Sequence, residues 1–252
     1  MKIFIDSADL NEIKEAFSWG IIDGVTTNPS LIKKALAGKN LKIDQYLQEL
    51  LTLTRGFPVS LEIEGEENGQ IREEQMLREA RNLYHQLKLF NPAFNIKIPV
   101  NPTLNPTEKH AFESLKVIKT LTKEGIPINA TLIMTPEQAL LAAKAGARYL
   151  SPFLGRIDDY VQSGKENKGI KAGVELIQEI KAVLNHYSFH TEIIGASIRT
   201  IEHVRECAKV GVEISTIPFK IIKEMIAHEK TYEGVKKFQE DMVPEYREFL
   251  RK

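Results

Sequence analysis

Short segments in which polar and apolar residues alternate recur along the chain, and each is followed by a longer segment with the apolar spacing of a helix. Successive side chains of a strand point to opposite faces, so this alternation predicts strands. The predicted strands cover residues 2–6, 21–25, 59–63, 95–100, 126–131, 147–152, 192–197 and 211–215. Several of them follow a glycine that ends the preceding helix, as Gly125 and Gly146 do.

Helix signals occupy most of the sequence between these strands. Asp9 stands in an N-cap position, and Thr135 is followed by a proline at the first helical turn. The predicted helices include 71–89, one that starts at 105–108, 170–185, 200–210 and 218–228, whereas 155–169 is predicted to be a polar loop.

The order of these elements predicts the fold class. Strict alternation of strand and helix indicates a parallel sheet in an α/β protein. Eight such units predict a single (β/α)8 TIM barrel over residues 1–252, with residues 229–252 as a C-terminal helical extension. The alternative is a doubly wound open sheet, which would favour a glycine-rich phosphate loop after the first strand, and the sequence has none there.

Composition narrows the class of protein. The chain is 42% hydrophobic and 27% charged with a formal net charge of +0, so no basic surface for nucleic acid or an anionic membrane is expected. The single cysteine, Cys207, lies in a helical context, which predicts a packed, unreactive thiol. The acidic Asp6 comes too early for a signal peptide, and no apolar run approaches the roughly 20 residues of a membrane span. We therefore expect a cytoplasmic protein.

Polar side chains stand at or near the ends of the predicted strands, several of them on the face opposite the large aliphatic residues. They are Asp6, Thr26, Asn28, Glu62, Lys97, Asn129, Thr131, Ser151, Ser197 and Arg199. In a barrel the aliphatic face packs against the helices and the other face points into the lumen, so these groups should meet at one mouth. Polar groups also fill barrel cores for structural reasons, and Thr26 and Ser151 fit that role equally well.

Lys97 lies in Asn95-Ile-Lys-Ile-Pro-Val100, on the face opposite the aliphatic residues. Taken alone, this segment is also compatible with an exposed edge strand and a solvated lysine. In a lumen, however, a desolvated amine attacks a ketone to form an imine, which then allows a neighbouring C–C bond to break. Two carboxylates, Asp6 and Glu62, suit the proton transfers of that reaction. The six histidines show no metal-ligand spacing, so neither a metal nor an organic cofactor is expected.

A candidate phosphate site lies near the later strands. Arg156, Ser197 and Arg199 are its candidate ligands, because arginine offers a planar fork of donors. Arg199 also precedes a predicted helix N-terminus, where the helix dipole favours an anion. The alternative for Arg156 is an ordinary surface residue.

Five motifs together resemble the transaldolase family. They are Phe4-Ile-Asp-Ser-Ala-Asp9, Gly24-Val-Thr-Thr-Asn-Pro-Ser30, Ile96-Lys-Ile-Pro-Val100, Ser151-Pro-Phe-Leu-Gly-Arg-Ile157 and Ala196-Ser-Ile-Arg199. In length and layout the chain is similar to the short subfamily, which also contains the fructose-6-phosphate aldolases. The resemblance implies a sugar-phosphate enzyme that forms a Schiff base and needs no cofactor.

The same resemblance implies a role for each matching residue. Lys97 matches the Schiff-base lysine, and Asp6 matches the acid–base group at the bond that is cleaved. The other matches are Glu62 and Thr131 for the catalytic water, Asn28 and Asn129 for substrate hydroxyls, Arg156, Ser197 and Arg199 for the phosphate, and Thr26 and Ser151 for the pocket wall.

Two positions distinguish the branches of the family. The aldolase branch resembles a pattern with glutamine where Glu62 stands and tyrosine where Phe153 stands. The resemblance therefore favours transfer of a dihydroxyacetone unit from fructose 6-phosphate or sedoheptulose 7-phosphate to erythrose 4-phosphate or glyceraldehyde 3-phosphate. Two alternatives stay open: an aldolase that releases free dihydroxyacetone, and a non-catalytic sugar-phosphate-binding barrel.

The C-terminal extension carries the apolar residues Val235, Phe238, Met242 and Phe249. One interpretation is that they pack against the barrel of the same chain. The resemblance implies instead that these helices pack across subunits of a homo-oligomer, in rings of five or pairs of such rings.

Overall fold

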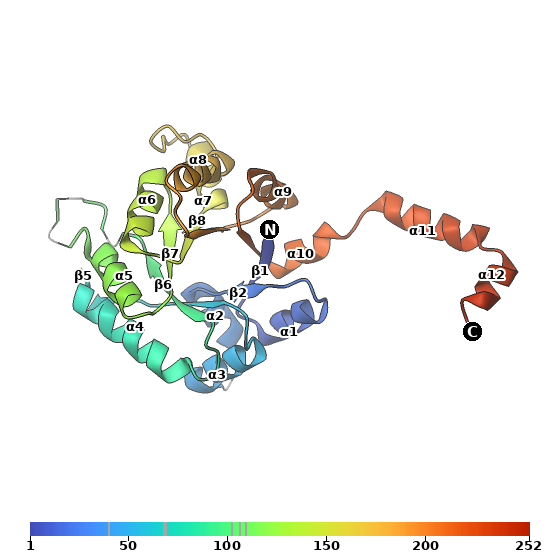
Figure 1. The fold of residues 1–252 in the computed structure, drawn as a ribbon, viewed down its shortest axis with the longest axis horizontal. Helices are drawn as coiled ribbons and strands as arrows, with labels where there is room; N and C mark the ends of the chain where they lie inside the picture. The colour runs from blue at the N-terminus through green and yellow to red at the C-terminus, as the bar shows by residue number, and fades with distance from the viewer. Residues whose placement is uncertain (40, 68–69, 102, 106, 109) are drawn as a thin grey trace.

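Eight parallel strands close into a barrel that helices surround on the outside (Figure 1). The structure, a computed structural model, describes residues 1–39, 41–67, 70–101, 103–105, 107–108 and 110–252. The barrel strands, in the order in which they pair, are β1 (Lys2–Asp6), β10 (Ile214–Ile217), β9 (Glu192–Gly195), β8 (Tyr149–Pro152), β7 (Ile128–Ile133), β6 (Phe94–Pro99), β3 (Val59–Glu62) and β2 (Gly24–Thr26). Since β2 pairs again with β1, the ring is complete and the predicted (β/α)8 TIM barrel is confirmed.

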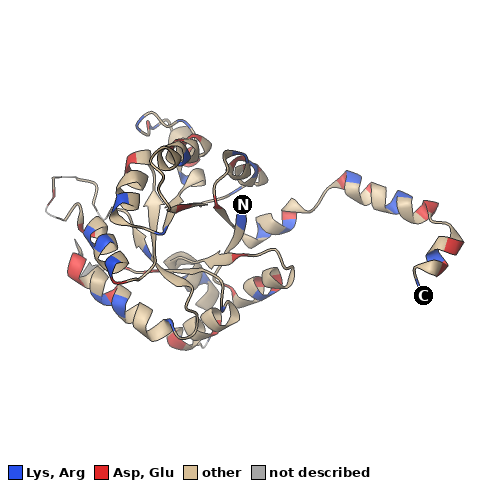
Figure 2. Cartoon of the chain, in the orientation of Figure 1, with Lys and Arg blue, Asp and Glu red and all other residues tan. Residues whose placement is uncertain are grey.

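The helices lie between consecutive strands along the chain and after the last strand, and they carry both signs of charge (Figure 2). They are α1 (Leu10–Ser18), α2 (Pro29–Leu36), α3 (Ile43–Leu53), α4 (Glu73–Leu87), α5 (Glu113–Lys123), α6 (Pro136–Ala145), α7 (Leu154–Gln162), α8 (Gly173–His186), α9 (Ile201–Val210), α10 (Phe219–Met225), α11 (Glu229–Asp241) and α12 (Pro244–Phe249). Side-chain oxygens cap several of them: Asp9 accepts from Asn11 N, and Thr135 accepts from Gln138 N.

Two sequence predictions about helices are wrong. The segment 155–169 was predicted to be a loop, but α7 begins at Leu154 because Leu154 and Ile157 form a buried apolar face, while Asp159 and Gln162 are exposed. The helix predicted to start at 105–108 begins only at Glu113, and Leu104 before it is fully exposed, so this apolar side chain gives an earlier turn no buried contact. Residues 106 and 109 of that prediction lie outside the described residues.

An antiparallel pair that the sequence pattern did not predict precedes α4. It consists of β4 (Glu66–Glu67) and β5 (Gln70–Ile71), so α4 starts two residues later than the predicted boundary of 71. Gly65, at φ 72°, stands directly before this pair, in the left-handed region that glycine adopts most easily.

The two ends of the barrel lumen differ in chemistry. Phe4, Tyr149, Ile194 and Ile214 form a separate buried cluster that fills the end near the strand N-termini. Gly24 permits this filling, because a Cβ there would lie 2.7 Å from the Phe4 ring. The end near the strand C-termini holds the polar side chains, and it is the end where (β/α)8 enzymes carry their active sites.

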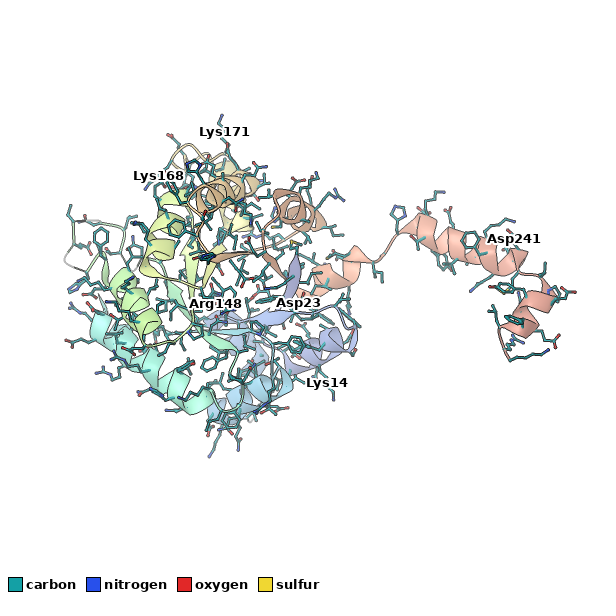
Figure 3. All side chains as sticks on the ribbon, in the orientation of Figure 1. Lys14, Asp23, Arg148, Lys168, Lys171 and Asp241 are labelled. Atoms are coloured by element: carbon teal, nitrogen blue, oxygen red, sulfur yellow. The ribbon has the colours of Figure 1, made fainter. Side chains whose placement is uncertain are left out.

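The C-terminal helices α11 and α12 extend away from the barrel (Figure 1). Asp241, at the end of α11, is labelled in Figure 3 and lies far from the barrel. Both helices lie within the described residues, and neither buries any side chain. The interpretation that this extension packs on its own barrel is therefore wrong. Among the described residues, no helix is long and apolar enough to cross a membrane.

Candidate active site

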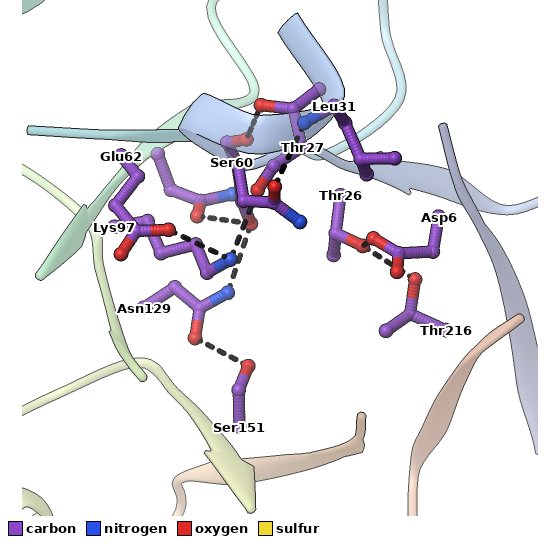
Figure 4. A network of polar contacts seen from close by, with 12 residues as sticks. Asp6, Thr26, Thr27, Leu31, Ser60, Glu62, Lys97, Asn129, Ser151 and Thr216 are labelled. Atoms are coloured by element: carbon purple, nitrogen blue, oxygen red, sulfur yellow. Dashed lines mark hydrogen bonds and ion pairs between the residues drawn. The ribbon is translucent and has the colours of Figure 1, made fainter. Parts of the chain in front are cut away.

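Lys97 occupies the middle of the site at the C-terminal end of β6. Its side chain is buried, with Nζ 2.9 Å from the Thr27 carbonyl oxygen and 3.1 Å from Glu62 Oε2 (Figure 4). The register of β3 against β6 pairs Glu62 with Lys97, which brings the two side chains together. Because β6 pairs with β7 on its other side, the alternative of an exposed edge strand is wrong. The buried ammonium is thus compensated by one carboxylate and one carbonyl.

Asp6 ends β1 on the other side of the mouth. Thr26 Oγ1 donates to Asp6 Oδ1 over 2.7 Å, and the Thr216 hydroxyl lies 2.6 Å from the same Thr26 oxygen (Figure 4). Burial raises the pKa of the Asp6 carboxyl above its ordinary value, while the Thr26 hydrogen bond and the charge of Lys97 offset part of that shift. Asp6 is therefore easier to protonate than a solvated aspartate.

A chain of buried hydrogen bonds supports the floor of the site. Ser151 Oγ donates to Asn129 Oδ1 over 2.8 Å, Asn129 Nδ2 donates to Ser60 Oγ over 3.0 Å, and Ser60 Oγ donates to Asn95 Oδ1 over 2.8 Å (Figure 4). These bonds fix the orientation of the Asn129 amide. Ser60 was missed as a site residue, although it lies two positions before Glu62 and so shares its face of β3.

Thr131 lies in an irregular part of β7. The pairing with β8 shifts its register between Ala130 and Ile133, and Leu132 adopts a φ of 57°, which is costly for a residue with a β-carbon. The Thr131 hydroxyl is buried and has no hydrogen-bond partner among the described residues. A buried hydroxyl without a protein partner is available to a bound water or ligand.

A cavity of about 130 Å³ opens between these groups. The residues that line it are Asp6, Thr26, Asn28, Lys97, Ser151, Phe153, Arg156, Ala196, Ser197 and Thr216. The Arg156 guanidinium lies 4.9 Å from the centroid of the Phe153 ring, which holds it against the wall. Asn28 caps α2, with Oδ1 accepting from Leu31 N at 3.0 Å, so its Nδ2 group remains as a donor. Eight of these lining residues are among those predicted from the sequence.

The remaining predicted residues are placed as follows. Glu62 and Asn129 each bond to a residue of the lining, Lys97 and Ser151 respectively. The Arg199 side chain instead points away, where it forms an ion pair with Asp159 on α7. The turn that carries Arg199 is close to the site nonetheless, because Ser197 lines the cavity.

Thr216 lines the cavity, and the sequence prediction did not include it. The last strand was predicted to end at residue 215, whereas β10 runs from Ile214 to Ile217. Glycine at 211 ends α9 with φ 77°, so the strand begins later than the apolar pattern suggested. Thr216 shares its face of β10 with Ile214, an aliphatic residue that also points into the lumen, so the alternation pattern gave no sign that Thr216 faces the site.

Titratable side chains also meet outside this site, where His110 contacts both Arg72 and Glu113. Among the described ranges, no group of three or more His, Cys, Asp or Glu side chains is arranged to hold a metal ion. Cys207 is buried in α9, and burial raises the pKa of its thiol to about 11, so it is unreactive as predicted.

Comparison with known proteins agrees with the motifs. The Transaldolase/Fructose-6-phosphate aldolase family model matches residues 3–250. A protein of Aquifex aeolicus named "Probable transaldolase" is 44% identical over 249 residues, which cover 97% of this chain and 99% of that protein. A protein of Caldicellulosiruptor saccharolyticus with the same name is 45% identical over 242 residues, 96% of each chain.

Solved structures of much lower sequence identity share the fold. A mandelate oxidase variant superposes with a TM-score of 0.51 at 13% identity, and the match covers 86% of this chain and 64% of that one. A lactate oxidase from Pediococcus acidilactici gives a TM-score of 0.53 at 13% identity, covering 86% and 62% of the two chains. At this identity the likeness concerns the barrel alone.

Proposed function

Because the chain belongs to the transaldolase/fructose-6-phosphate aldolase family, we propose that it is a transaldolase that works through Lys97. It moves a dihydroxyacetone unit from fructose 6-phosphate or sedoheptulose 7-phosphate to erythrose 4-phosphate or glyceraldehyde 3-phosphate. The observation that carries the proposal is the buried Lys97 amine, 3.1 Å from Glu62, in a cavity that Asp6 also lines.

The first stage is formation of an imine. The Lys97 amine, after its proton has passed to Glu62, attacks the C2 carbonyl of the ketose and forms a carbinolamine. Glu62 and Thr131 position the water that leaves as the imine forms and returns when it is hydrolysed. The buried hydroxyl of Thr131, which has no hydrogen-bond partner in the part of the chain that the structure describes, supports that role.

The second stage is cleavage of the C3–C4 bond. The Asp6 carboxylate takes the proton of the C4 hydroxyl, the oxygen forms a carbonyl, and the C3–C4 electrons move into the iminium to give an enamine on Lys97. An aldose phosphate leaves. The raised pKa of Asp6 supports this assignment, because a base with a pKa nearer the working pH takes up a proton more readily.

The phosphate and the hydroxyls of the substrate bind to different residues of the site. Arg156 and Ser197, which line the cavity, bind the phosphate. Asn28 and Asn129 contact the substrate hydroxyls, while Thr26 and Ser151 form part of the wall. Arg199 joins the phosphate by leaving Asp159, an exposed pair whose loss costs little.

Transfer, rather than release of the three-carbon unit, follows from the residues around Lys97. Phe153 lines the cavity where a tyrosine would place a phenol beside the water. Without that acidic hydroxyl the enamine is protonated slowly and survives until an acceptor aldehyde binds. Glu62, which stands where the aldolase pattern has glutamine, favours the same outcome.

Borohydride trapping tests the lysine mechanism. The chain is incubated with fructose 6-phosphate and sodium borohydride, digested, and analysed by peptide mass for a reduced dihydroxyacetone adduct. We expect the adduct on the peptide that contains Lys97, none in Lys97→Met, and an unchanged adduct in Lys168→Met, which changes an exposed lysine at the barrel rim (Figure 3). An adduct that persists in Lys97→Met would refute the assignment, and a binding-only barrel would give no adduct at all.

Product analysis then separates transfer from release. With fructose 6-phosphate and erythrose 4-phosphate, a transaldolase produces sedoheptulose 7-phosphate and little free dihydroxyacetone. An aldolase produces dihydroxyacetone at a rate that does not depend on the acceptor. Phe153→Tyr should raise the share of released dihydroxyacetone, and no change in that share would contradict the role given to Phe153.

The exposed C-terminal helices support a homo-oligomer. On α11, Tyr232, Val235 and Phe238 are 62%, 48% and 74% exposed, at spacings that place them along one side of the helix. We propose that this side packs against another copy of the chain, in a pentamer or decamer. Sedimentation of the full chain against Val235→Asp/Phe238→Asp tests this: an unchanged sedimentation coefficient would refute it.

A further inference from the structure

Thr216 has no role in the mechanism described above, yet it is part of the site. It is 2% exposed and lines the cavity together with Asp6 and Thr26. The three residues come from adjacent strands, because β1 lies between β2 and β10 in the barrel. Asp6 pairs directly with Thr26. Thr216 pairs with Phe4, which lies on the same face of β1 as Asp6 and two residues further from the mouth.

The hydroxyl protons can be assigned by counting. A threonine hydroxyl has one proton to donate. When Asp6 is ionised, the Thr26 proton is used in the 2.7 Å bond to Asp6 Oδ1. The 2.6 Å contact between the two threonine oxygens must then have Thr216 as its donor. The result is a directed chain, Thr216 to Thr26 to Asp6 (Figure 4).

This direction has two consequences for the carboxylate. First, Oδ1 is occupied by Thr26, which leaves Oδ2 for the reacting hydroxyl. Second, hydrogen bonds in a chain polarise each other, so donation from Thr216 strengthens the bond that Thr26 gives to the buried carboxylate. Lys97 and Glu62 are the other charged groups that act on Asp6, with opposite signs.

We propose that Thr216 is a positioning residue for the acid–base step: through Thr26 it selects Asp6 Oδ2 as the reacting oxygen and stabilises the ionised carboxylate. This rests on the proposed function for the identity of the reaction. In that reaction Oδ2 takes the proton of the C4 hydroxyl during cleavage and returns it to the new hydroxyl when the acceptor has been attacked. The threonine protons stay on their own oxygens throughout.

Three variants of the full-length chain test the proposal. Thr216→Val keeps the shape and removes the donor, whereas Thr216→Ser keeps the donor. Ser215→Ala is the matched control, because it removes a hydroxyl from the same strand beside Cys207, on the outer face. Thr216→Ala is the second removal variant if the valine prevents folding, as judged by near-UV circular dichroism.

The decisive readout is the pKa of the Asp6 carboxyl, measured by carbon-13 NMR on aspartate-labelled protein and assigned with Asp6→Asn. We expect Thr216→Val to raise this pKa by about 0.1–0.7 units, since polarisation adds roughly 10–30% to the free energy of a charged hydrogen bond. The acidic limb of kcat/KM for transfer should move by the same amount, which lowers kcat/KM by up to about fivefold at a pH on that limb, and Thr216→Ser should stay close to the unchanged chain.

An unchanged Asp6 pKa in Thr216→Val overturns the proposal, whether or not the rate falls, because a merely structural role would lower the rate and leave the titration alone. An equal shift in Ser215→Ala overturns it as well. The NMR titration needs no substrate. If the unchanged chain fails to transfer the three-carbon unit, the proposed function is wrong, and the titration still decides the role of Thr216.

Discussion

The substitution Gly155→Ala should weaken phosphate recognition although it replaces no phosphate ligand. Gly155 lies in the first turn of α7, directly before Arg156, and its N–H donates to the Ser197 carbonyl over 3.1 Å. A Cβ at this position would lie 2.5 Å from the Ser197 oxygen and 2.7 Å from Arg199 Nε. Both distances are shorter than real contacts of a methyl group, so α7 or the 197–199 turn must move.

The magnitude follows from what that movement separates. Arg156 is on one side of the clash and Ser197 on the other, so both cannot keep their places around one phosphate. Losing one charged hydrogen bond costs about 1.5–3 kcal/mol. We therefore expect KM for fructose 6-phosphate to rise by about 10- to 100-fold, with a much smaller effect on kcat.

The assay compares transfer from fructose 6-phosphate with transfer from unphosphorylated fructose. Only the phosphorylated donor should lose affinity. Gly234→Ala is the matched control, because that glycine is also helical and a Cβ there meets nothing within 4 Å. Equal losses for both donors would show that Gly155→Ala disturbs the whole site, and an unchanged KM would refute the steric argument.

Three further predictions concern stability. Gly195→Ala should lower the free energy of unfolding by about 1–3 kcal/mol in urea titrations, because its Cβ would lie 2.6 Å from Cys207 Sγ. Adding Cys207→Ala should recover part of this loss. If the double variant recovers nothing, the clash with Cys207 is not the cause. Tyr46→Phe should cost about 1–3 kcal/mol, since the buried phenol donates to the Ala8 carbonyl over 2.6 Å; a neutral effect in the same assay would refute this. The folded-state pKa of Asp6 is raised, so its stabilising contribution is complete below the unfolded pKa of about 3.9 and is lost as pH rises through the folded pKa. The free energy of unfolding of Asp6→Asn, compared with that of the unchanged chain, should therefore be more favourable at pH 7 than at pH 3.5. A difference between the two proteins that does not change with pH would refute the sign.

Strand alternation accounts for most of what the sequence predicted correctly. A strand has a strict period of two residues, so the aliphatic neighbours of Lys97, Glu62 and Asp6 determine which way those side chains point. The closed barrel then brings the three together, although they come from three different strands. Side-chain direction inside the lumen is therefore a local property that can be predicted from a few residues.

The errors arose where local pattern does not determine the outcome. Thr216 was missed because Ile214, on the same face of β10, is aliphatic and nevertheless points into the lumen, so the pattern favoured the opposite direction for this face. Arg156 was placed on a loop because the charged face of α7 concealed the buried Leu154 and Ile157. The direction of Arg199 depends on Asp159, a carboxylate about 40 positions away along the chain that alternation cannot reveal.

The pairing of β1 with β10 joins the first strand of the chain to the last strand of the barrel. During synthesis, Glu62 and Lys97 emerge on neighbouring strands and can meet early, but β1 keeps an open edge until β10 has been made. Closing a loop of this length is slow compared with pairing neighbouring strands. Asp6 therefore gains its complete surroundings only when synthesis of the barrel is finished. An incomplete chain that carries the lysine lacks the finished acid–base group, so the order of translation itself delays cleavage chemistry until the fold is complete.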